Sequence, residues 1–71
     1  MCLAAVYINR GDGAPKELVL DKVQVIDVDG AKLTCRNLFG QTAEIEGFVT
    51  RIDLENSTVE VAQGIAERRG V

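Results

Sequence analysis

The sequence predicts an all-β protein, a small five-stranded SH3-like barrel. Three observations support this class: short segments in which apolar and polar residues alternate, turn residues about every ten positions, and phase changes inside the two longest segments. Such phase changes indicate β-bulges, which strongly bent small barrels need in order to close. An OB-type barrel is the nearest alternative, but it usually has longer strands and an intervening helix. We expect one barrel domain over residues 1–64 and a C-terminal tail over residues 65–71.

The first predicted strand covers residues 2–9 and is apolar on both faces. One alternating set contains Cys2, Ala4, Val6 and Ile8, and the other contains Leu3, Ala5 and Tyr7. A strand in a lone antiparallel barrel has one face in water, so an apolar outer face indicates that something else covers it. The simplest cover is another copy of the chain, and we therefore expect a homodimer.

The second predicted strand covers residues 17–28 and contains the first phase change. Its later apolar residues are Val23 and Val25 and then, on the opposite parity, Ile26 and Val28. This change predicts a bulge. Asp29-Gly30 follows as a tight hairpin turn, and the strand after it is expected to turn Leu33 and Cys35 inward.

The fourth predicted strand covers residues 42–54 and changes phase at Gly47. Its expected inward residues are Ala43 and Ile45 before the glycine and Phe48, Thr50, Ile52 and Leu54 after it. A glycine inside a strand often marks a sharp bend, so Gly47 is predicted as the second bend of the barrel. The last strand is expected over residues 58–62, with Val59 and Val61 facing inward.

Charge and hydropathy narrow the class of partner. Eleven acidic and eight basic residues give a net charge of −3, which is the wrong sign for attraction to a phosphate backbone and argues against nucleic acid. No apolar run approaches the roughly 20 residues needed to span a bilayer. The first residues also lack the basic and long apolar regions of a signal peptide. We therefore expect a cytoplasmic protein that does not enter a membrane.

The residue types argue against an enzyme. The chain contains no histidine, the commonest general base and metal ligand. A cysteine nucleophile would lack its neighbouring base, and the glycines are scattered rather than gathered in a phosphate-binding loop. The acidic residues Glu44, Glu46, Asp53, Glu55 and Glu60 alternate with apolar positions, as on a solvated outer face. No two of them form an acid and base pair.

The two N-terminal residues form the candidate metal site. The thiolate of Cys2, its own amide nitrogen and the amino group of Met1 lie within two residues, so around one ion they close fused five-membered chelate rings. Nickel(II) and copper(II) favour square-planar nitrogen and sulfur ligands of this kind, whereas zinc prefers a tetrahedral set. One chain supplies at most three such donors, and a two-fold dimer brings a second Cys2 to the same ion.

The residues alone also allow a structural role for each cysteine. Cys2 can be a small apolar residue that begins a strand, because free cysteine is among the most buried residue types. The chelate also requires that Met1 is retained, which we assume. Cys35 shares its parity with Leu33 and is predicted to be an inert core residue, since an apolar environment raises a thiol pKa.

Two non-metal functions are the alternatives. An RNA-binding SH3-like module without metal would combine arginines with aromatic stacking surfaces. Its candidate residues are Arg36, Arg51, Arg68 and Arg69 with Tyr7, Phe39 and Phe48. A plain interaction module with no ligand is the other alternative, and neither depends on Cys2.

Several short segments together resemble the CooT family of small bacterial and archaeal proteins. These segments are Met1-Cys2 before an alanine-rich strand, Asp29-Gly30, Asn37-Leu38-Phe39-Gly40, Glu46-Gly47 and Arg51-Ile52-Asp53-Leu54. The resemblance spans roughly Met1 to Val61. It implies an SH3-like fold, a homodimer, and nickel(II) binding through the cysteine after the initiator methionine, which is Cys2 here.

The resemblance also implies a cellular role. The family is linked to nickel delivery during maturation of carbon monoxide dehydrogenase, so the client is expected to be that enzyme or a related nickel enzyme. Family members are also labelled RNA-binding proteins, a label that rests on the fold. The sequence thus predicts a nickel chaperone that holds one Ni(2+) per dimer through Cys2, with Met1 as the adjacent donor.

Overall fold

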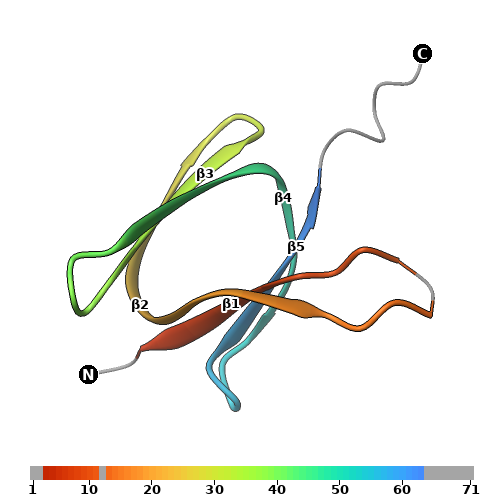
Figure 1. The fold of residues 1–71 in the computed structure, drawn as a ribbon, viewed down its shortest axis with the longest axis horizontal. Coiled ribbons are helices and arrows are strands. Elements are labelled where there is room, and N and C mark those ends of the chain that lie inside the picture. The colour runs from red at the N-terminus through yellow and green to blue at the C-terminus, as the bar shows by residue number, and fades with distance from the viewer. Residues whose placement is uncertain (1–2, 12, 64–71) are drawn as a thin grey trace.

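The computed structural model describes residues 3–11 and 13–63, which form five β-strands in a closed barrel (Figure 1). The strands are β1 (Ala4–Ile8), β2 (Glu17–Asp29), β3 (Lys32–Asn37), β4 (Thr42–Asp53) and β5 (Thr58–Gln63). The all-β, five-stranded barrel expected from the sequence is confirmed. The predicted tail over residues 65–71 lies outside the described residues, as do Met1 and Cys2. Within the described ranges, there is no helix that could cross a bilayer.

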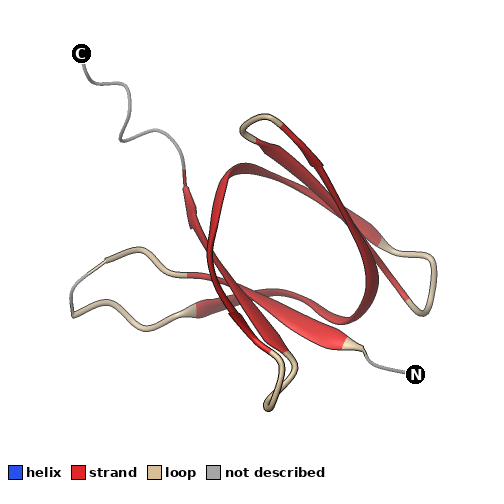
Figure 2. Ribbon diagram, turned by 180° about the vertical axis from the view of Figure 1, so that it is seen from behind, coloured by secondary structure: helices blue, strands red, loops and turns tan. Residues whose placement is uncertain are grey.

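The barrel closes through a parallel pair. Consecutive strands pair antiparallel in the order β1-β2-β3-β4-β5, and an odd number of such strands leaves the first and last running in the same direction. β1 and β5 therefore pair in parallel, from Ala5 opposite Thr58 to Ile8 opposite Val61. Figure 2 shows the resulting ring of strands from behind. Because of this closure, β1 is hydrogen-bonded on both sides and is not an exposed edge.

The core is built from inward-facing residues of all five strands. Its buried apolar members are Val6, Ile8, Val23, Leu33, Cys35, Ile45, Val59 and Val61. Most are β-branched residues, which suit a pleated and half-buried surface. The inward orientation predicted for Leu33, Cys35, Ile45, Val59 and Val61 is confirmed.

The bulge predicted in β2 is confirmed near the middle of the strand, at Val23, which pairs with both β1 and β3. It lies just before the parity change that the sequence places after Val25. The pairing of β2 with β3 shifts between Val23 and Val25, so Val23 faces the core and Val25 does not. Beyond the shift, Ile26 lies opposite the buried Cys35 and packs on the core. Lys22, next to the bulge, has a left-handed backbone with a φ of 54°.

Gly47 forms the predicted second bend, at the corner where β4 changes partners. β4 pairs with β3 up to Glu46, opposite Lys32, and pairs with β5 from Gly47, opposite Gln63. A Cβ atom at position 47 would overlap the carbonyl oxygen of Ala62 and lie 3.0 Å from the Cα atom of Gln63. Only glycine permits this approach of the two backbones.

The predicted phase change at Gly47 is wrong. Ile45 and Gly47 are buried and Val49 packs on the core, so the alternation continues unchanged through the glycine. The register shift occurs instead between Val49 and Arg51, where Thr50 is the extra residue. A strand can bend at a glycine without gaining a residue, whereas a phase change needs an inserted one.

As a consequence, the four apolar and polar residues predicted to face inward after Gly47 do not enter the core. Phe48, Thr50, Ile52 and Leu54 are all exposed. The hydroxyl of Thr50 donates to the carbonyl oxygen of Glu60 at 3.2 Å. Ile52 lies opposite the buried Val59, but the strand has reached the end of the barrel there and Ile52 is 62% exposed.

Candidate functional site

The strand that leads to the predicted metal site is held on both sides from its first residues. Met1 and Cys2 lie outside the described residues, so the described part of the chain shows what anchors the strand behind them. Ala4 pairs with Val23 of β2, and Ala5 pairs with Thr58 of β5. The first strand pairing that the structure describes therefore begins two residues after Cys2.

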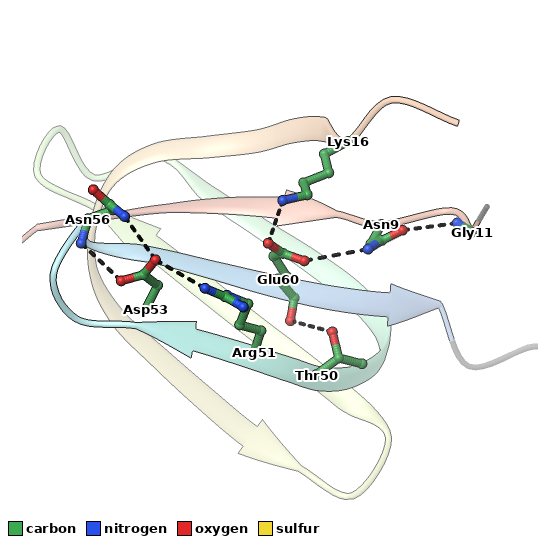
Figure 3. A network of polar contacts seen from close by, with 8 residues as sticks. All are labelled: Asn9, Gly11, Lys16, Thr50, Arg51, Asp53, Asn56 and Glu60. Atoms are coloured by element: carbon green, nitrogen blue, oxygen red, sulfur yellow. Dashed lines mark hydrogen bonds and ion pairs between the residues drawn. The ribbon is translucent and has the colours of Figure 1, made fainter. Parts of the chain in front are cut away.

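A structured turn between β4 and β5 holds the start of β1. The carboxylate of Asp53 accepts hydrogen bonds from the backbone nitrogen of Asn56 at 3.1 Å and from its side-chain nitrogen at 2.9 Å (Figure 3). These bonds hold the pKa of Asp53 below its ordinary value. The carbonyl oxygen of Ser57, at the end of the turn, accepts a hydrogen bond from the amide of Ala5 at 2.9 Å.

A second turn lies on the other side of the start of β1. It connects β3 to β4, and the amide of Leu38 donates to the carbonyl oxygen of Lys22 at 2.9 Å, next to the Val23 that pairs with Ala4. The side-chain oxygen of Asn37 accepts from the amide of Phe39 at 3.0 Å. In Figures 1 and 2, both turns lie on the side of the barrel where β1 begins.

The two turns expose large apolar side chains. Leu38 is 46% exposed and Phe39 is 68% exposed on the β3–β4 turn. Ile52 and Leu54, on and beside the β4–β5 turn, are 62% and 85% exposed. The barrel end around the start of β1 therefore carries exposed apolar side chains on two sides.

Glu60 departs from the sequence prediction, which placed it on a solvated outer face. This residue of β5 is 8% exposed, because the loop between β1 and β2 covers it. Its carboxylate accepts from the Lys16 ammonium at 2.6 Å and from the Asn9 amide at 3.4 Å (Figure 3). The Lys16 bond is the main reason that the pKa of Glu60 lies below its ordinary value. Sequence periodicity contains no signal for this contact, since Lys16 is 44 positions away.

We expect this buried carboxylate to make stability depend on pH. A carboxyl group whose folded pKa is lowered stabilises the fold above its unfolded pKa, about 4.3 for glutamate, and this contribution disappears as the pH falls through the folded value. The thermal midpoint of Glu60→Gln should therefore be lower than that of the wild type near neutral pH, and the two should converge in acid. Circular dichroism melts between about pH 3 and pH 7 measure this difference. Glu55→Gln, at an exposed turn position, is the control, and its thermal midpoint should vary with pH as that of the wild type does. The same pH dependence of the thermal midpoint in all three proteins would contradict the prediction.

Cys35 lies in the core, as predicted. Its side chain is fully buried, and this burial raises the pKa of the thiol. A buried thiol of this kind remains protonated and unreactive. In the described part of the chain, no three histidine, cysteine, aspartate or glutamate side chains come together as a possible metal site.

The residues considered for RNA binding are not cross-strand neighbours where the structure describes them. Arg36 on β3 pairs with Val25 and Thr42, whereas Arg51 on β4 pairs with Glu60 and donates to Asp53 at 3.5 Å. Tyr7 is half-buried on β1, and the exposed Phe39 and Phe48 lie on the β3–β4 turn and on β4. Arg68 and Arg69 lie outside the described residues.

Comparison with known proteins identifies the family. Residues 1–62 match the family profile described as CO dehydrogenase accessory protein CooT. A crystal structure of a protein assigned as CooT from Carboxydothermus hydrogenoformans has a TM-score of 0.79 and 27% sequence identity, over 87% of this chain and 97% of that one. No curated protein sequence matches. The chain therefore belongs to the CooT family of carbon monoxide dehydrogenase accessory proteins.

Proposed function

We propose that this protein is a cytoplasmic nickel(II) chaperone that supplies the metal to carbon monoxide dehydrogenase, or to a related nickel enzyme, during its maturation. The main support for this proposal is the match to an accessory-protein family. The match begins at Met1-Cys2 and continues to residue 62. An accessory protein that delivers the metal to its enzyme needs a site that binds the metal and releases it. The N-terminal thiolate with its adjacent nitrogen atoms supplies such a site.

The donor chemistry of the first two residues fits nickel. A thiolate, a deprotonated amide nitrogen and an amine in consecutive positions lie close to one plane when they bind the same ion, and Ni(II) accepts that geometry. The three donors leave at least one position open for a ligand from elsewhere. A second Cys2 from another copy of the chain fills that position and places one nickel ion at the dimer axis.

The apolar turns at the start of β1 support a dimer that meets at this end of the barrel. The expectation of a dimer came from the outer face of β1, but Ala5 and Tyr7 on that face are half-buried within a single chain. The β3–β4 and β4–β5 turns expose much more apolar surface, on Phe39, Ile52 and Leu54. Contact through these turns would bring the starts of the two β1 strands together, and an ion shared by the donors that precede them requires this.

A nickel titration tests the proposal. Isothermal titration of the wild-type protein should give one nickel ion for every two chains, and zinc should bind more weakly because the in-plane donors do not suit a tetrahedral ion. Absence of nickel binding would contradict the proposal. Fluorescence anisotropy with labelled single-stranded RNA tests the alternative, which predicts salt-dependent binding that survives loss of Cys2.

The proposed dimer contact gives a separate prediction. Leu54→Asp should raise the dimer dissociation constant at least about tenfold, because the interface would then bury an unpaired charge. Sedimentation equilibrium measures this constant. Val28→Asp is the matched control, since Val28 is 64% exposed at the far end of β2, beside the β2–β3 turn. Equal dimer constants for the two variants would contradict a contact through the β4–β5 turn.

A further inference from the structure

The β4–β5 turn has more internal support than an ordinary surface turn. Asp53 accepts two hydrogen bonds from Asn56, and the guanidinium of Arg51 lies 3.5 Å from the same carboxylate. Figure 3 shows Asp53 between these two residues. A carboxylate that accepts backbone and side-chain donors in this way fixes the path of a turn.

The turn ends in a conformation that costs free energy. Ser57 has a φ of 55°, in the left-handed region, where a Cβ atom lies too close to the following carbonyl oxygen. In this conformation its carbonyl oxygen accepts from the amide of Ala5 at 2.9 Å. Strain of this kind persists where surrounding contacts enforce it, and it is often found next to functional sites.

The other left-handed residue with a side chain, among those described, lies on the opposite side of the same strand. This residue is Lys22, next to the Val23 that pairs with Ala4. Its carbonyl oxygen holds the β3–β4 turn through Leu38. Both strained residues therefore flank the start of β1, one on the β5 side and one on the β2 side.

We propose that the β4–β5 turn, from Asp53 to Ser57, is a positioning element for the nickel donors, acting through the Ser57–Ala5 hydrogen bond. Ala5 is three residues from Cys2 in the sequence. It is the residue of β1 nearest to Cys2 with a described hydrogen bond to the β4–β5 turn. A binding constellation must be held within about 0.5 Å of its productive geometry. The turn meets this need by fixing the strand from which the donors extend. This inference rests on the proposed function.

The test compares Asp53→Ala with two conservative variants. Asp53→Ala should speed amide hydrogen exchange at Ala5 and raise the nickel dissociation constant about tenfold, in the range seen when a supporting residue of a metal site is lost. It should also change the ligand-field absorption of bound nickel. Asp53→Asn retains a side-chain oxygen for the Asn56 amide and should restore most of the affinity. Ser57→Gly favours the left-handed conformation and should bind nickel within about twofold of the wild type.

A destabilised control separates positioning from general loss of stability. Glu60→Gln removes a contact at the far end of β1, so it should lower the thermal midpoint while leaving nickel affinity and absorption unchanged. The inference is overturned if Asp53→Ala leaves Ala5 exchange unchanged, or if exchange rises while nickel affinity and absorption match the wild type. Failure of the proposed function would appear differently, as a wild-type protein that binds no nickel at all.

Discussion

Replacement of Cys2 with serine should abolish nickel binding and leave the barrel intact. Serine keeps the size of the side chain, but its hydroxyl does not ionise as a thiol does and is a poor ligand for nickel. Loss of a ligand itself should exceed the roughly 10–100-fold effect of losing a residue that only supports one. Calorimetric titration and thermal melts of the same sample measure both quantities. The melt should be nearly unchanged, because serine occupies almost the same volume as cysteine.

The second cysteine supplies the control for this experiment. Cys35→Ala should retain nickel binding but lower the free energy of unfolding, since it removes a fully buried side chain from the core. The two variants therefore separate the roles of the two thiols. If the Cys2→Ser protein bound nickel as tightly as the wild type, the metal site would lie elsewhere.

Gly47→Ala should destabilise the barrel more than any other single methyl group added to a described glycine. The new Cβ atom would overlap the carbonyl oxygen of Ala62, a backbone atom that cannot rotate away. Overpacking typically costs about 1–3 kcal/mol, and a backbone clash at a barrel corner should lie at or above the upper end. A small domain has only about 5 kcal/mol of stability, so the variant should be largely unfolded at moderate temperature.

Chemical denaturation measured by circular dichroism tests this prediction. Glu46→Ala is the matched control, because Glu46 is the neighbouring exposed residue on the same strand. Its free energy of unfolding should stay within about 0.5 kcal/mol of the wild-type value. A Gly47→Ala protein with wild-type stability would contradict the close approach of β4 and β5 at this corner.

The parts of the fold that follow from local pattern were predictable from the sequence. Alternation places Cys35, Val59 and Val61 in the core, and the change of parity after Val25 indicates the bulge in β2. The failure at Gly47 has a physical reason. Glycine has no side chain, so the pattern cannot distinguish a bend that preserves the alternation from one that inserts a residue. The residue that is actually inserted, Thr50, has no such signal in the sequence pattern.

The surroundings of the candidate site depend on contacts between distant parts of the chain. Burial of Glu60 comes from the β1–β2 loop, and the anchor of Ala5 comes from Ser57, which meets β1 only because the barrel closes. Parity predicts the side of β4 on which Ile52 lies, but not that the barrel ends there. The chemical candidate itself, Cys2, followed from its place in the sequence, because its donors lie within two residues.

Native mass spectrometry with and without added nickel is the decisive test of a nickel ion shared by two chains, because one spectrum reports the subunit count, the metal count and whether Met1 is retained. We expect a species of two chains, each retaining Met1, with one nickel ion that is lost on adding a chelator. A monomer that carries its own nickel ion, or a dimer that takes up none, would contradict this expectation.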